Sequence, residues 1–274
     1  MVIALLAMLG IGAFFIFDEF NNDDDHAEET PENVDTPGTN GADFIGGTPE
    51  DDLLLALGGN DLVVGEQGQD TIDGGNGLDL LMGGKGDDLI EGRNDDDLLI
   101  GGKGEDTLNG GKGDDVLFGS DAVRDVELGR DLLAAETEQD FNAILDSDDY
   151  YDDSRDLAQA DILNGGDGED VLIMGSNDTG TSGEGEDLIV IGDWIDPDKG
   201  PAVITDLRDP DTSGDLLVYN YNGANAAPVI TVEHDEVAGV SHVYADNGLV
   251  LEVLHVASAP LIKVGDISLV AYSV

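Results

Sequence analysis

The stretch that decides the fold is Gly83-Gly84-Lys85-Gly86-Asp87-Asp88-Leu89-Ile90-Glu91, a nine-residue unit of the form G-G-x-G-x-D-x-U-x in which U is aliphatic. The pattern keeps its register from residue 38 to residue 118. All nine units have Asp at position six and an aliphatic residue at position eight, and only Glu50 and Asp95 replace Gly at position four. Two columns that stay in phase over this length identify an internal repeat, and such a repeat determines the architecture.

The repeat predicts a parallel β-roll, an all-β fold. Positions one to six form a turn and positions seven to nine a short strand whose middle side chain points into the core. Two units then complete one coil of about eighteen residues, and coils stack at about 4.8 Å. Alternate aspartates, such as Asp70, Asp88 and Asp106, therefore stack in one column, and Asp79 and Asp97 belong to a second column on the opposite edge.

The stacked carboxylates predict a metal site in each pair of neighbouring turns. Two unit charges near 4 Å repel by about 1 kcal/mol in bulk water and by about 4 kcal/mol at an effective dielectric of twenty. A divalent cation between the turns converts this repulsion into coordination. Ca²⁺ accepts six to eight oxygens in loose geometry, whereas Mg²⁺ requires a tight octahedron, and the turns contain no His or Cys for zinc or copper.

The candidate ligands extend beyond the first block of repeats, because the pattern resumes at residue 161. The predicted metal-binding aspartates are Asp43, Asp52, Asp61, Asp70, Asp79, Asp88, Asp97, Asp106, Asp115, Asp161, Asp170 and Asp187. The predicted turn glycines at position four are Gly59, Gly68, Gly77, Gly86, Gly104, Gly113, Gly168 and Gly185. Since one site needs two stacked turns, nine uninterrupted units allow about seven ions. Glu50 and Asp95 are expected to distort their own turns.

Composition agrees with a fold that needs cations. The chain has 62 acidic and 10 basic residues, a formal net charge of −52, which excludes nucleic acid as a partner. Such a charge often indicates disorder, but 40% of the residues are hydrophobic and recur regularly. There is no Cys, which excludes disulfides and thiol chemistry. One narrow aliphatic column gives little core, so we expect the repeats to fold only with metal bound.

The repeats resemble the repeats-in-toxin (RTX), or hemolysin-type calcium-binding, family; Gly83–Glu91 and Gly110-Gly111-Lys112-Gly113-Asp114-Asp115-Val116-Leu117-Phe118 are close to its consensus. The resemblance implies a secreted protein, exported from a Gram-negative bacterium by a type I secretion apparatus. The tail at residues 266–274 is similar to the uncleaved C-terminal signals of such substrates. An apolar N-terminus departs from the family pattern.

The flanking segments have other compositions. Residues 1–17 are apolar and predict a membrane anchor, an export segment or an element docked on the fold; as a helix they would span about 25 Å. Residues 18–37 are an acidic linker. The insert at residues 119–160 contains a predicted short helix within residues 131–145, and residues 161–194 form the second repeat block. Residues 195–274 predict an antiparallel β cap with a hairpin turn at Asp246-Asn247-Gly248.

Three functions are compatible with these features. The first is a non-enzymatic extracellular or cell-surface protein that folds on binding extracellular Ca²⁺. The second is an enzyme with an unrecognised active site, although neither H-E-x-x-H nor G-x-S-x-G occurs in the sequence. The third is an adhesin or matrix protein that uses residues 195–274 as its contact module.

Overall fold

The computed structural model describes residues 37–119, 159–192, 194–207, 214–222, 225–254 and 261–272. The apolar segment, nearly all of the acidic linker and most of the insert, including its predicted helix, lie outside the described residues. Apart from the 3₁₀ turn η5 (Val264–Asp266), all regular elements of the described part are strands.

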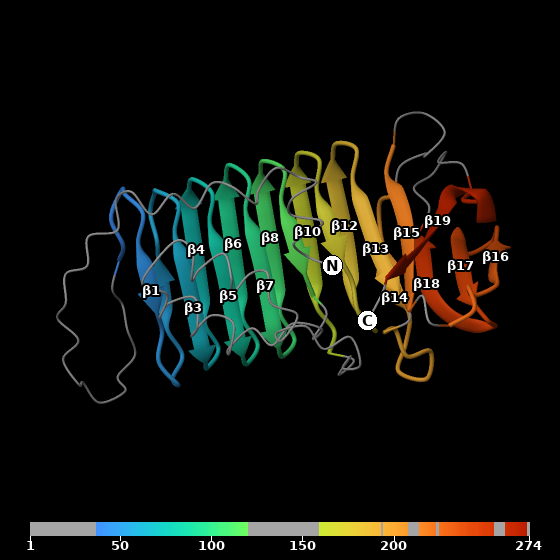
Figure 1. Ribbon diagram of the computed structural model, residues 1–274, viewed down its shortest axis with the longest axis horizontal. Helices are drawn as coiled ribbons and strands as arrows, with labels where there is room; N and C mark the ends of the chain where they lie inside the picture. Colours follow the sequence, from blue (N-terminus) through green and yellow to red (C-terminus); the bar gives the residue numbers. More distant parts are fainter. Residues whose placement is uncertain are drawn as a thin grey trace.

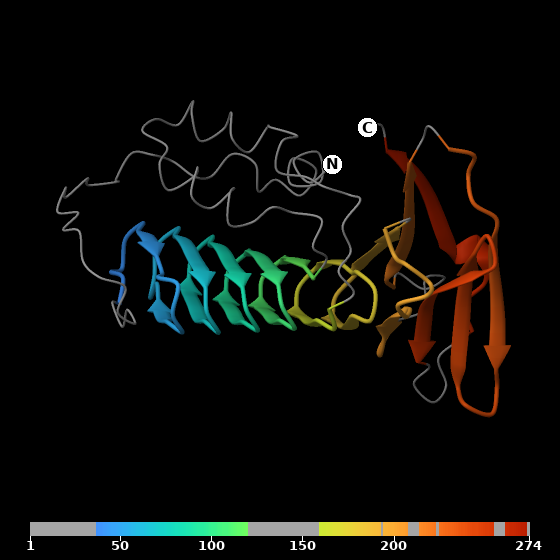
Figure 2. The same ribbon diagram turned by 90° about the horizontal axis from the view of Figure 1, so that it is seen from below.

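The strands form two long sheets that face each other (Figures 1 and 2). The nine-stranded sheet has, in spatial order, β1 (Phe44–Gly46), β3 (Leu62–Gln67), β5 (Leu80–Lys85), β7 (Leu98–Lys103), β9 (Val116–Phe118), β11 (Val171–Ile173), β13 (Leu188–Gly192), β15 (Leu216–Asn222) and β19 (Ile267–Tyr272). The ten-stranded sheet has β16 (Ile230–Asp235), β17 (Val240–Ala245), β18 (Gly248–Leu254), β14 (Ala202–Ile204), β12 (Thr179–Glu184), β10 (Ile162–Asp167), β8 (Thr107–Lys112), β6 (Leu89–Asn94), β4 (Thr71–Asn76) and β2 (Leu53–Leu55).

Successive units alternate between the sheets, which confirms the predicted parallel β-roll. Each strand pairs in parallel with the strand two units away, so Leu80 lies opposite Leu98 and Leu81 opposite Leu99. Most strands are six residues long and not three, because position nine continues into positions one to three of the next unit. The sharp turn is therefore confined to positions four to six.

The insert does not change the register in which the strands pair. Thr107 of β8 pairs with Ile162 of β10 across 55 residues, where other neighbouring strands are 18 residues apart. The coils before and after the insert therefore stack directly on each other. The next coil is one residue short, since Ile162 pairs with Thr179.

The core is the position-eight column, whose members from Leu54 to Leu117 are all fully buried. Side chains at positions seven and nine point away from this core, to the outer face of each sheet. On the ten-stranded sheet these outer residues are largely polar, such as Thr107 and Asn109, and part-exposed. On the nine-stranded sheet they are apolar and buried, as Met82 and Phe118 show. The two outer faces of the roll are thus chemically different.

Residues 202–272 continue both sheets. β16, β17 and β18 are antiparallel, as predicted, and the β17–β18 turn has positive φ at Asp246 (50°) and Asn247 (75°). β14 and β18 add in parallel to the ten-stranded sheet, and β15 and β19 to the nine-stranded sheet. The C-terminal region therefore extends the roll as well as closing it.

Candidate metal-binding turns

The position-six aspartates lie in two continuous columns along the edges of the roll. In each column, Oδ1 of one aspartate accepts the backbone N–H of the aspartate one coil earlier, as Asp79 does from Asp61 at 2.9 Å and Asp97 from Asp79 at 2.8 Å. All twelve candidate aspartates join these ladders. The predicted alternation of the two columns matches this arrangement.

The second carboxylate oxygen has a different environment. Oδ2 is buried and accepts no hydrogen bond in Asp61, Asp70, Asp79, Asp97, Asp115, Asp170 and Asp187. A buried charged oxygen without a donor is costly, because it has lost its water without replacement. Each of these carboxylates therefore requires a partner that the hydrogen bonds of the fold do not supply.

Burial changes the acidity of these groups accordingly. Loss of solvent raises the pKa of Asp79 to about 8 and, together with the charge of Asp79, that of Asp97 to about 9. Burial likewise raises the pKa of Asp170 to about 8 and the pKa values of Asp61, Asp70 and Asp115 to about 7. At pH 7 Asp79, Asp97 and Asp170 are therefore mostly protonated in the metal-free folded state, and the three groups with a pKa of about 7 are about half ionised.

Peptide carbonyls converge on the same oxygens. At Gly65, position one of its unit, an added Cβ would lie 2.4 Å from Oδ2 of Asp70 and 2.4 Å from the carbonyl oxygen of Gly83 in the next coil. At Gly92 the corresponding distances, to Asp97 Oδ2 and the Gly110 carbonyl, are 2.4 and 2.8 Å. At these two units position one has no room for a side chain, whereas Ala56 and Ser182 hold the same position in two other units; the space above Gly65 and Gly92 is lined by one carboxylate and one carbonyl oxygen.

The position-four residues make the second close approach between coils. Gly104 has φ of 148°, and an added Cβ would lie 1.7 Å from the carbonyl oxygen of Gly86. Asp95 keeps a positive φ of 74° at this position, so its turn retains the handedness of the neighbouring turns and the expected distortion is not seen there. Its Oδ2 also accepts the N–H of Gly77 at 3.1 Å.

This oxygen set fits Ca²⁺. Calcium takes carboxylate and carbonyl oxygens at about 2.3–2.6 Å in flexible geometry. Among the described residues no three His, Asp or Glu side chains cluster around one point. A bound ion would therefore depend on peptide carbonyls for much of its coordination, which agrees with the stacked carbonyls of positions one and four.

Three groups of ladder residues were missed in the sequence. Asp178 extends one column, with Oδ1 3.1 Å from the N–H of Asp161, and the signal was a spacing of 17 residues in place of 18. Asp215 ends the other column near Asp187, where only Asp-Leu-Leu-Val resembles positions six to nine. Position-five acids form an outer ladder in the opposite direction, because Oδ1 of Asp87 accepts the N–H of Glu105 in the next coil.

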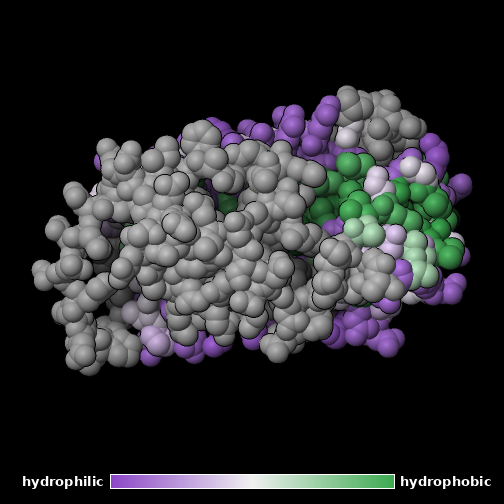
Figure 3. Space-filling view, in the orientation of Figure 1, coloured by the Kyte–Doolittle hydropathy of each residue, from purple (hydrophilic) through white to green (hydrophobic). Residues whose placement is uncertain are grey.

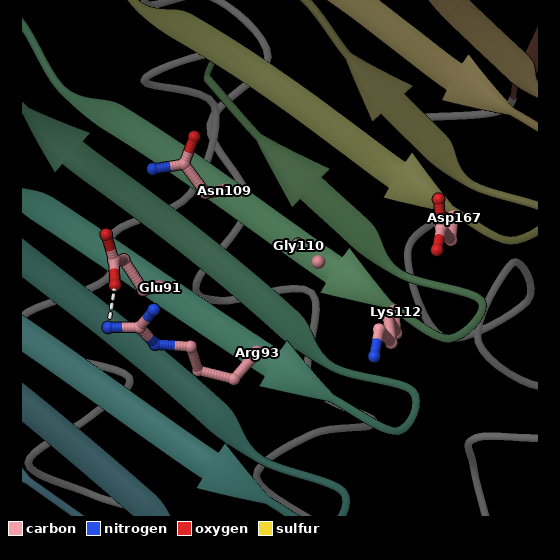
Figure 4. A pocket seen from close by; sticks show the side chains of 7 residues that line it. Glu91, Arg93, Asn109, Gly110, Lys112 and Asp167 are labelled. Atoms are coloured by element: carbon pink, nitrogen blue, oxygen red, sulfur yellow. Dashed lines mark ion pairs between the residues drawn. The ribbon is translucent and has the colours of Figure 1, made fainter.

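Charged groups on the outer face of the ten-stranded sheet serve a different role. A depression of about 320 Å³ is lined by residues that include Glu91, Arg93 and Lys112 (Figure 4). The Arg93 guanidinium contacts Glu91 and donates to Asp73 Oδ2 at 2.8 Å. These part-exposed ion pairs contribute about 0–1 kcal/mol each to stability.

The described histidines have structural partners. His234 Nδ1 lies 2.8 Å from Ser241 Oγ, and His242 Nε2 lies 3.3 Å from Glu252. Asp235, beside His234, accepts the N–H groups of Val237 and Ala238 in a turn. Ser241 is fully buried, and these contacts hold together strands β16, β17 and β18.

The fold and its edges define a class: a parallel β-roll whose glycine-rich turns carry two buried columns of aspartate. Comparison with protein families identifies the repeat. The RTX calcium-binding nonapeptide repeat matches in four copies, at residues 37–72, 73–108, 91–122 and 152–178. Residues 37–122 and 152–178 therefore consist of RTX calcium-binding repeats, as the resemblance predicted. No curated protein matches the chain.

The family assigns Ca²⁺ to these turns. The individual ligands and the number of ions remain predictions. Within the described residues no helix is long and apolar enough to cross a membrane, and residues 1–17 lie outside that part of the chain.

Proposed function

We propose that this chain is an extracellular or cell-surface calcium-binding protein, without catalytic activity, whose β-roll folds when extracellular Ca²⁺ enters the turns. The position-six aspartates and position-four glycines predicted above shape the sites. The observation that carries the proposal is the set of buried Oδ2 atoms that accept no hydrogen bond, in Asp61, Asp70, Asp79, Asp97, Asp115, Asp170 and Asp187.

Coupled folding follows from the energetics of these oxygens. Ionising a buried aspartate whose pKa has risen from 3.8 to about 8 costs on the order of 5 kcal/mol more in the folded than in the unfolded chain. A single domain is stable by only about 5–15 kcal/mol, so several such groups suffice to prevent folding at neutral pH. Millimolar extracellular Ca²⁺ removes the penalty, whereas scarce cytosolic Ca²⁺ leaves the chain unfolded.

An unfolded cytosolic chain also suits export. We propose the type I secretion apparatus as the route, with residues 266–274 as the signal, and residues 1–17 as a membrane anchor or export segment. Fractionation that follows the intact protein to the medium, or to the membrane, distinguishes a secreted from an anchored form.

The experiment that tests calcium-coupled folding is a Ca²⁺ titration of the whole chain, followed by circular dichroism and by counting bound ions. We expect β structure to appear cooperatively as several ions bind, and Mg²⁺ at the same concentration to be ineffective. A chain that is fully β-structured in chelator contradicts the proposal.

A contact role for the C-terminal β region is the second candidate. Apolar surface gathers over this end of the molecule (Figure 3). β19 ends the nine-stranded sheet, and its residues Leu269 and Val270 are 43% and 46% exposed. If residues 195–274 bind a matrix or a cell surface, replacing both residues by Asp should abolish retention there without reducing the number of bound ions. Unchanged retention would remove this candidate.

A further inference from the structure

The first two turns of the roll differ from the later turns that follow the nine-residue pattern. In each of them a threonine occupies position two and donates to the position-six carboxylate of the same unit. Thr48 donates to Oδ2 of Asp52 from its backbone N–H at 2.6 Å and from Oγ1 at 3.0 Å. Thr39 donates twice to Oδ2 of Asp43 in the same way, at 2.5 and 2.9 Å.

The threonine hydroxyl also closes the turn. Oγ1 of Thr39 accepts the N–H of Gly41 at 3.1 Å, and Oγ1 of Thr48 accepts the N–H of Glu50 at 3.3 Å. The hydroxyl thus links position four to position six within one unit. Oδ2 therefore has two donors here, whereas it accepts no hydrogen bond in the seven later aspartates named above.

Backbone conformation separates the same two turns independently. From the third unit onward, positions two and four have positive φ in every described unit that follows the nine-residue pattern. This holds even where the residue is not glycine, as at Leu57 (75°), Glu66 (80°) and Arg93 (88°). Thr39, Gly41, Thr48 and Glu50 do not have positive φ.

The imposed conformation at Leu57, Glu66 and Arg93 has a cost. A residue with a Cβ in this region loses on the order of 1 kcal/mol or more. Its persistence there indicates that the later turns share one conformation that their common function requires. The threonine turns do not adopt that conformation, so the turns of the first coil have a different backbone geometry from the later turns.

We propose that residues 38–55 form a calcium-independent cap, in which Thr39 and Thr48 supply to Asp43 and Asp52 the hydrogen bonds that replace a metal ion. The inference rests on the proposed function and narrows it, because Asp43 and Asp52 then cease to be calcium ligands. In the first block, sites begin with the turns of Asp61 and Asp70, and the expected number falls from about seven ions to about five.

The cap has a structural consequence. Oδ1 of Asp61 accepts the N–H of Asp43 at 2.7 Å, and Oδ1 of Asp70 accepts that of Asp52 at 2.8 Å. A first coil whose carboxylates are satisfied without metal therefore orients the first two aspartates of the calcium-binding turns. It provides an end on which the metal-dependent coils can stack.

The test compares two double variants that differ by one coil. D43N/D52N removes the charges from the cap, and D61N/D70N makes the matched change eighteen residues later. Bound Ca²⁺ per whole chain is counted by atomic absorption after dialysis at saturating Ca²⁺. We expect D43N/D52N to keep the wild-type count and D61N/D70N to lose about two ions. Equal losses overturn the proposal.

A gain-of-site variant tests the same point without removing any carboxylate. T39G/T48G/E50G gives both cap turns the glycines of later units and removes the threonine hydroxyls. We expect about two additional ions per chain, and an unchanged count overturns the proposal. If the wild-type chain itself binds no Ca²⁺, the proposed function fails; if it binds Ca²⁺ but D43N/D52N loses ions, only the cap fails.

Discussion

Replacing Asp79 by Asn should have opposite effects on stability with and without Ca²⁺. Asp79 is 2% exposed; its Oδ1 accepts the N–H of Asp61, and its Oδ2 accepts no hydrogen bond. Asn keeps the acceptor and replaces Oδ2 by an amide NH₂. An added Cβ at Gly74 would lie 2.5 Å from Asp79 Oδ2 and 3.1 Å from the Gly92 carbonyl oxygen, so both atoms border the same position-one glycine.

The magnitude follows from the pKa of Asp79, which burial raises from 3.8 to about 8. Because the folded-state pKa lies above the unfolded-state pKa, the metal-free folded state is favoured at low pH and loses stability as pH rises from about 4 to about 8. At pH 7.5 the loss is on the order of 5 kcal/mol, and Asn does not incur it. In chelator, D79N should therefore be more stable than wild type by up to that amount.

The assay is refolding by a stabilising osmolyte in chelator at pH 7.5, followed by circular dichroism. D79N should refold at a lower osmolyte concentration than wild type, yet need more Ca²⁺ to fold when the metal is titrated. Glu105→Gln is the control, because it removes one exposed charge and should change neither midpoint appreciably. If D79N is destabilised in chelator as well, the buried charge is not what prevents folding.

Three further predictions concern the coils. In thermal or denaturant unfolding with Ca²⁺ present, Gly104→Ala should lower the free energy of unfolding by about 3 kcal/mol or more, because φ is 148° and the Gly86 carbonyl oxygen would lie 1.7 Å from the new Cβ. Its control is Gly265→Ala, which has nothing within 4 Å of the new Cβ and should leave stability unchanged. Leu99→Ala, fully buried, should cost about 2–5 kcal/mol, against about 0.5 kcal/mol or less for Leu269→Ala, which is 43% exposed. In chelator, circular dichroism should show β structure increasing as pH falls from 9 towards 5, since Asp61, Asp79 and Asp97 become protonated at about pH 7, 8 and 9; constant β content across this range would contradict the raised pKa values.

The fold could be predicted from the sequence because the period is strict. A nine-residue spacing fixes which aspartates stack, and Leu81 and Leu99 face each other because they occupy the same position one coil apart. The aliphatic column, the alternation of sheets and the two edges all follow from that spacing. No long-range information is needed where each coil contacts only its neighbours.

The sequence did not predict the aspartates and strands that depart from the nine-residue period. Asp178 follows Asp161 by 17 residues, and Asp215 follows Asp187 by 28, so neither lies on the nine-residue grid. The parallel addition of β14 and β15 to the roll is likewise unmarked by any repeat. Their positions depend on packing, which sequence periodicity does not record.

Differences in hydrogen bonding between units of the repeat could not be predicted from the sequence either. The sequence pattern assigns the same role to Asp43 and Asp61, yet Thr39 donates to the first carboxylate and Oδ2 of the second has no donor. The distinguishing signal is threonine in place of glycine at position two. It becomes interpretable only when the hydrogen bonds are known.

The two carboxylate oxygens of a position-six aspartate have different roles, one in stacking the coils and the other in binding the metal. Oδ1 accepts a backbone N–H from the previous coil, so it is satisfied only when coils are stacked, as between Asp97 and Asp79. In Asp97 and the six other aspartates without a donor, Oδ2 is buried in the stacked roll and then needs a cation. Coil stacking therefore forms the metal site, and the bound metal offsets the cost of the buried carboxylate charge that opposes stacking. A roll stable without metal would need a donor for every Oδ2, and the threonine turns of the first coil show how this sequence provides one.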